Sequence, residues 1–108
     1  MTCLSVVAAT FLGSVSVARG QHAQDDAQMA YFNCMDTEPG ARRSIADLAS
    51  QGALNRQAIA LIVVNAEEVC ANQQTTWLSL YPADERGYVN HVSHQFFIDT
   101  LCKRFGAC

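Results

Sequence analysis

The chain has 108 residues, a formal net charge of -3 and a single lysine. It carries no basic stripe and no Arg/Lys-rich amphipathic helix, so its composition argues against nucleic acid and against a membrane surface as partners. A chain of this length has room for one small domain.

The chain starts with an apolar run from Leu4 to Ala18. A bilayer-spanning helix needs about 20 apolar residues, whereas a shorter run that ends in small residues is typical of a secretory signal. We therefore predict a signal peptide over residues 1–18, with cleavage as late as residue 20, and a flexible polar lead over 19–26. An uncleaved buried helix or membrane anchor is the alternative. The mature protein is expected in the periplasm or outside the cell, with no stable membrane insertion.

Residues 27–108 are predicted to form a single helical domain, because apolar residues recur at helical spacing and no alternating β pattern appears. The expected helices cover about 25–36, 41–50, 56–73 and 83–105, with a short helical turn over 75–81. Glu38-Pro39-Gly40 is expected to end the first helix and turn the chain. Gly52 suits the C-terminal cap of the second helix, and Asn55 suits the N-cap of the third.

The third predicted helix contains a run of consecutive apolar residues, Ala58 to Val64. Such a run covers the whole circumference of a helix, so the helix must be surrounded. We expect it to be the central element of the bundle. The alternative is that its outer side meets a second copy of the chain in a homodimer.

Four cysteines follow the apolar start, and they permit three pairings. If the helices alternate up and down, the first and third run the same way, so Cys34 and Cys70 lie at one end of the bundle. Cys102 then lies at the other end, where a turn through Gly106 brings Cys108 back to it. We therefore favour Cys34–Cys70 with Cys102–Cys108 over the other two pairings. The predicted fold class is all-α: a small disulfide-stapled bundle of four helices plus a short helical turn.

The search for chemistry yields little. His91 and His94 are three apart on the last helix, with Asp84 two turns before His91, but two helical histidines without a fixed third ligand are a weak metal signal. The cysteines lack the C-x-x-C spacing of redox and zinc sites. No nucleophile elbow or glycine-rich phosphate loop occurs. We expect no enzyme activity, no cofactor and no resident metal.

Three aromatic residues flank the connection before the last helix: Trp77, Tyr81 and Tyr88. Trp and Tyr are enriched at interface hot spots, although the same rings are also suited to capping a core. We predict a small exported protein-binding module of the inhibitor or immunity type, whose partner is another protein. One alternative is an acid-stress or chaperone-like periplasmic protein with a histidine-linked pH response. The other is a weak metal-binding carrier.

Overall fold

The described part of the chain is helical, as predicted. The computed structural model describes residues 21–108, and the expected signal peptide over 1–18 lies outside them. The first helix covers residues 21–37, and four others follow as α2 (Pro39–Ser50), α3 (Arg56–Val69), α4 (Ala71–Leu78) and α5 (Arg86–Phe105). No strand occurs within residues 21–108.

Three helix starts differ from the predicted ones, and one of them is that of α2, which begins at Pro39 instead of about residue 41. Residues 21–26, expected as a flexible polar lead, form the first turns of the first helix, because they include no glycine or proline that would oppose helix formation. The last helix begins at Arg86 instead of Ala83, and residues 83–85 form turns ahead of it. Gly87 therefore lies in the first turn of α5.

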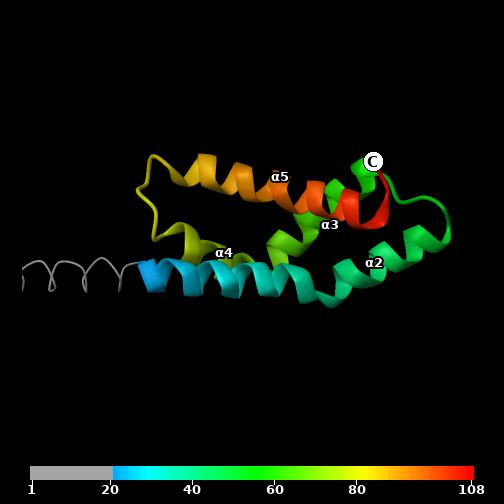
Figure 1. The fold of residues 1–108 in the computed structure, drawn as a ribbon. Helices are drawn as coiled ribbons and strands as arrows, with labels where there is room; N and C mark the ends of the chain where they lie inside the picture. The colour runs from blue at the N-terminus through cyan, green and yellow to red at the C-terminus, as the bar shows by residue number, and fades with distance from the viewer. Residues whose placement is uncertain (1–20) are drawn as a thin grey trace, which may run out of the picture.

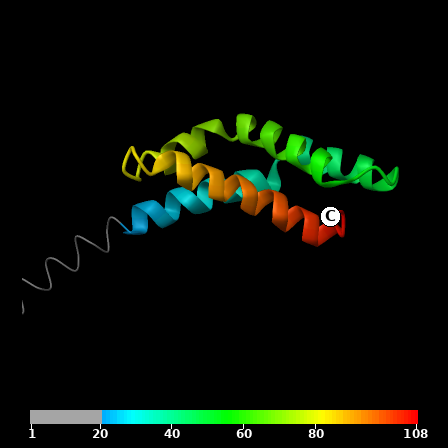
Figure 2. The same cartoon turned by 90° about the horizontal axis from the view of Figure 1, so that it is seen from above.

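The helices form three arms (Figures 1 and 2). The first helix and α2 run in one general direction, α3 and α4 return, and α5 runs beside them in the original direction. The first helix and α3 are therefore antiparallel, so the expectation that they run the same way is wrong. The up-and-down alternation fails because the chain does not reverse between the first helix and α2.

Proline explains why there is no reversal at residues 38–40. Pro39 is the first residue of α2, where the missing N–H costs no helical hydrogen bond. Glu38 is the N-cap, and its carboxylate accepts hydrogen bonds from the backbone N–H groups of Gly40 and Ala41. The predicted end of the first helix is confirmed, but the expected turn is instead the start of another helix.

The reversal comes after α2 and uses the two predicted caps. Gly52 adopts a φ of 66°, and its N–H donates to Ala49 while the N–H of Ala53 donates to Leu48. This is the Schellman pattern that closes many helices. The side chain of Asn55 then accepts from the N–H of Ala58 at 2.8 Å and caps α3.

The third helix is shorter than predicted. It ends at Val69, and α4 starts at Ala71, two residues before the expected end at Gln73. The expected helical turn over 75–81 is accordingly replaced by α4. Cys70, between the two helices, is fully buried and bonded to Cys34. Because no glycine or proline marks this break, the local pattern carries no signal for it.

Both predicted disulfides are confirmed. Cys34–Cys70 joins the end of the first helix to the α3–α4 junction, with the two Cα atoms 6.0 Å apart. Cys102–Cys108 closes a short loop at the end of α5, where Gly106 has a φ of 58° and lets the chain turn back. The two bonds are consistent with an oxidising, exported compartment.

α3 is the central helix, and it packs against α2, α4 and α5. Within its apolar run, Ile59, Ile62 and Val63 are buried, which confirms the expected core role. Leu61 and Val64 lie on the other side, 63% and 43% exposed. The run is therefore only half covered within the described residues, and the homodimer through Ala58–Val64 stays a prediction.

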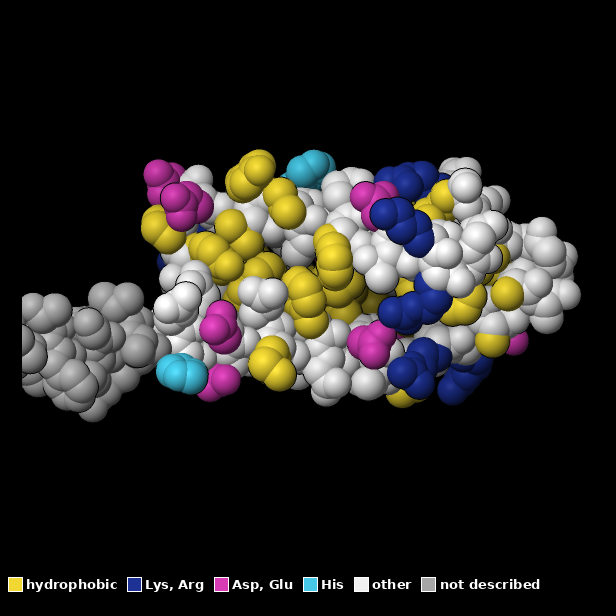
Figure 3. Space-filling view, viewed as in Figure 1, with side chains coloured by type: hydrophobic (Ala, Val, Ile, Leu, Met, Phe, Trp, Pro, Cys, Tyr) yellow, Lys and Arg dark blue, Asp and Glu magenta, His cyan; other side chains and the backbone are white. Residues whose placement is uncertain are grey.

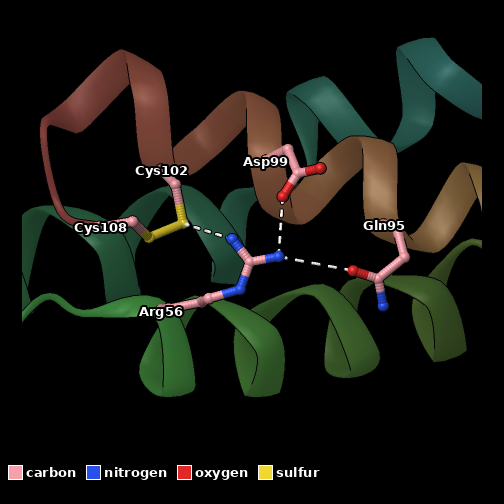
Figure 4. Close-up of polar contacts among 5 residues, drawn as sticks. All are labelled: Arg56, Gln95, Asp99, Cys102 and Cys108. Carbon is pink, nitrogen blue, oxygen red and sulfur yellow. Dashed lines mark hydrogen bonds and ion pairs between the residues drawn. A yellow bond between two sulfur atoms is a disulfide. The ribbon is translucent and has the colours of Figure 1, made fainter.

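Arg56 links the start of α3 to the last turns of α5 (Figure 4). Its guanidinium donates to Asp99 Oδ1 at 2.8 Å and to Gln95 at 3.5 Å, and it approaches the Cys102 sulfur at 3.9 Å. Arg56 and Asp99 are both about half exposed, so this ion pair contributes at most about 1 kcal/mol to stability. It fixes the register of α5 on α3 next to the Cys102–Cys108 disulfide.

Candidate functional site

The three predicted interface aromatics do not share a surface. Trp77 is 3% exposed and stacks on Tyr31, with ring centroids 5.5 Å apart. Tyr81 is half-buried and meets the Trp77 ring edge-on. Tyr88 is 73% exposed. The core-capping alternative therefore describes Trp77 and Tyr81, and only Tyr88 offers its ring to solvent.

The three weak metal candidates are not brought together either. His94 Nδ1 lies 2.9 Å from Glu67 Oε1, while Asp84 lies in the turns ahead of α5. No group of three potential metal ligands gathers within residues 21–108.

A small polar layer surrounds the His94–Glu67 pair, between α3, α4 and α5. Gln74 Nε2 donates to Asn90 Oδ1 at 2.7 Å, and both residues line a shallow groove with Glu67 and His94. The Tyr31 ring is fully buried in the adjoining core. Burial, followed by the charge of Glu67, raises the pKa of the Tyr31 hydroxyl well above its usual range.

Replacing Tyr31 with phenylalanine tests how the buried hydroxyl next to this polar layer affects stability. The Tyr31 hydroxyl lies near the Glu67 and Gln74 side chains but makes no well-aligned hydrogen bond within residues 21–108, so Tyr31→Phe should leave the free energy of unfolding at pH 7 unchanged or raise it by up to about 1 kcal/mol. Because the pKa is raised in the folded state, the stability held by the neutral phenol is complete below about pH 10 and is lost above it. The variant should lose less stability above pH 10, as measured by urea unfolding across pH. A loss of 2 kcal/mol or more at pH 7 would show that the hydroxyl is hydrogen-bonded.

One concave feature of residues 21–108 is an apolar cleft of about 760 Å³. α2 and α5 both pack on α3, and the cleft lies between them with α3 as its floor. Its apolar lining comes from four of the five described helices: Phe32 and Met35 from the first helix, Ala41, Ile45, Ala46 and Ala49 from α2, Ile62, Val63 and Ala66 from α3, and Phe96, Phe97, Leu101 and Phe105 from α5. We call this feature the apolar cleft.

An aromatic group forms one wall of the apolar cleft. Phe32 stacks on Phe96 and meets Phe97 edge-on, with ring centroids 5.8 and 4.8 Å apart. Phe96 nevertheless remains 51% exposed, and Phe105 at the other end of the wall is 44% exposed. Leaving large apolar side chains half exposed around a concavity is typical of a binding surface.

Charged residues stand at the rim of the cleft. Arg104 Nη1 lies 3.5 Å from Asp36 Oδ1, and both side chains are more than half exposed. Arg42 donates from Nε to the backbone carbonyl of Asp36 at 3.0 Å, so its charge is not neutralised by that contact. Both guanidinium groups thus contact Asp36, Arg104 at its carboxylate and Arg42 at its backbone carbonyl. Figure 3 shows Lys and Arg side chains gathered at this end of the molecule and apolar side chains between the helices.

No family model, curated protein or solved structure matches this chain. The site must therefore be interpreted from its geometry alone. Within residues 21–108, no helix is both long enough and apolar enough to cross a membrane.

The apolar cleft could not be predicted from local sequence patterns, because its lining combines α5 with the first helix, α2 and α3, which lie well before it in the chain. One signal was available in the sequence: Phe96 adds to the apolar residues that the last helix carries at helical spacing, Phe97, Ile98, Leu101 and Phe105. In the structure Ile98 is buried in the core, whereas Phe96 and Phe105 are left at the surface. A helix with more apolar width than its neighbours can cover is a hint of an exposed apolar site.

Proposed function

We propose that this chain is a small exported, non-enzymatic protein-binding module that contacts its partner through the apolar cleft. The observation that carries the proposal is the half-exposed Phe96 beside a cleft lined mainly by apolar side chains. Interfaces concentrate their binding energy in aromatic anchors near an apolar centre with a polar rim. Here Arg42, Asp36 and Arg104 supply such a rim.

Two observations support export. The disulfides need an oxidising compartment to persist, and the apolar run from Leu4 to Ala18 predicts a secretory signal. Periplasm and extracellular space are equally compatible with these features.

The proposal predicts that Phe96→Asp abolishes partner capture while Leu61→Asp does not. Both positions are more than half exposed, so both variants should fold, but only Phe96 lines the apolar cleft. The experiment uses the mature protein with a photo-crosslinking amino acid at Thr100, also in the cleft lining, in an extract of the source organism. We expect one specific adduct that is lost with Phe96→Asp and kept with Leu61→Asp.

Circular dichroism and the melting temperature of each variant serve as folding controls. An adduct that survives Phe96→Asp would show that the cleft is not the binding surface. The absence of any specific adduct from Thr100 would count against a protein partner at this site.

A further inference from the structure

We infer that the partner segment in the apolar cleft is an amphipathic helix that carries a carboxylate beside its apolar stripe. This inference rests on the proposed function and names the chemistry of the partner. The cleft supplies an apolar track, and its rim supplies two arginines that lie close together at one place. An acidic amphipathic helix satisfies both features at once.

The shape of the cleft favours a helix over a small molecule. Along α5 the lining extends from Phe96 to Phe105, which corresponds to about 14 Å of helix. Three side chains at positions i, i+4 and i+7 of a docked helix span about 10 Å, the usual anchor pattern for a helix in a groove. The α2 wall presents small alanine side chains that leave room for bulky anchors. A small ligand would instead need enclosure over most of its surface.

The charges at the rim favour an acidic partner. Of the seven Lys and Arg residues in the chain, Arg42, Arg43, Arg56, Lys103 and Arg104 belong to α2, the start of α3 and the end of α5. The same segments and the residues just before α2 carry the carboxylates of Asp36, Glu38, Asp47 and Asp99, so this end of an otherwise acidic protein has a small excess of positive charge. Figure 3 shows the Lys and Arg side chains gathered there. Paired guanidinium groups recognise a carboxylate with good geometry.

Asp36 is expected to affect the affinity for an acidic partner. Its carboxylate contacts Arg104 across the rim, at 3.5 Å, in a half-exposed and weak ion pair. A carboxylate from the partner would compete with Asp36 for the same guanidinium. Removing the charge of Asp36 should therefore improve the binding of an acidic helix, whereas a purely apolar contact would be indifferent to it.

The test uses two synthetic 18-residue helical peptides with leucines at i, i+4 and i+7. One carries glutamates on the flank of the leucine stripe, and the other carries lysines at the same positions. Fluorescence anisotropy measures the affinity of each peptide for the disulfide-intact mature protein. We expect the glutamate peptide to bind about tenfold more tightly than the lysine peptide at low salt, and the difference to shrink as salt is added.

Matched variants locate the effect. Arg42→Glu and Arg104→Glu should each weaken the glutamate peptide by about fivefold to tenfold and strengthen the lysine peptide, because attraction is replaced by repulsion. Arg43→Glu makes the same change in net charge at a neighbouring position outside the cleft lining, and should change either affinity by less than about twofold to threefold. Asp36→Asn should tighten the glutamate peptide by about twofold to threefold.

Equal affinities for the two peptides, or equal effects of Arg42→Glu and Arg43→Glu, would overturn the carboxylate inference. Failure of both peptides to bind would overturn the helix inference as a whole. Either result can occur while the Thr100 adduct is still formed and is still lost with Phe96→Asp. In that case the proposed function stands and only the chemistry of the partner is wrong.

Discussion

Replacing Cys34 and Cys70 together by alanine is expected to lower the free energy of unfolding by about 4 kcal/mol. The bond closes a loop with a sequence separation of 36 residues, and the chain-entropy model gives this size for the loss of constraint on the unfolded chain. A domain of this size has a total stability of similar magnitude. The double variant should therefore be partly or wholly unfolded at 37 °C. A urea titration followed by circular dichroism measures the loss in the free energy of unfolding.

The second disulfide provides the matched comparison. Cys102–Cys108 has a sequence separation of only 6 residues, so its removal should cost about 2 kcal/mol on the same model. Replacing Cys102 and Cys108 by alanine should therefore leave the protein folded at 25 °C. If the two double variants lose equal stability, loop length does not control the contribution of these bonds.

Replacing Trp77 by alanine is expected to cost about 3–5 kcal/mol, the range for truncating a large buried aromatic. Trp77 is 3% exposed and touches the rings of Tyr31, Phe32 and Tyr81. Its removal would leave a cavity at the centre of the aromatic core, where the surrounding rings relax only in part. The measurement is the free energy of unfolding in urea with Cys34–Cys70 intact.

Tyr88→Ala is the control for Trp77→Ala. Tyr88 is 73% exposed, so its truncation should change the free energy of unfolding by less than about 0.5 kcal/mol. A small effect of Trp77→Ala, similar to that of Tyr88→Ala, would show that Trp77 is not part of the folded core. The pair of variants thus separates the core-capping and surface interpretations of these rings.

The disulfide pairing was predicted correctly from an incorrect premise. The predicted pairing assumed that the first and third helices run parallel. In the structure α2 starts at Pro39 and runs on in the direction of the first helix, and the chain reverses only at Gly52. The first helix and α3 are therefore antiparallel. Cys34 and Cys70 still meet because both lie near the middle of their arms, Cys34 in the last turn of the first helix and Cys70 between α3 and α4.

The candidate site was harder to predict than the fold. Trp77 and Tyr81 were singled out because aromatic residues are common in interfaces. The type of a residue, however, does not show whether another helix covers it. Phe96, which is not among the three predicted aromatics, is 51% exposed and lines the apolar cleft. Burial depends on the helices that pack around a side chain, and those helices come from distant parts of the chain.

The sequence by itself determined the helical class and the caps at Gly52 and Asn55. It also determined the short chain length, which favours stabilisation by disulfides. These features depend on helical spacing, on the backbone preferences of single residues and on chain length. Only the tertiary structure decided that α3 breaks at Cys70, that Trp77 is buried and that α2 and α5 separate above α3 to leave the apolar cleft. Helical spacing decides which side chains share a face, but the packing of distant helices decides which face remains uncovered.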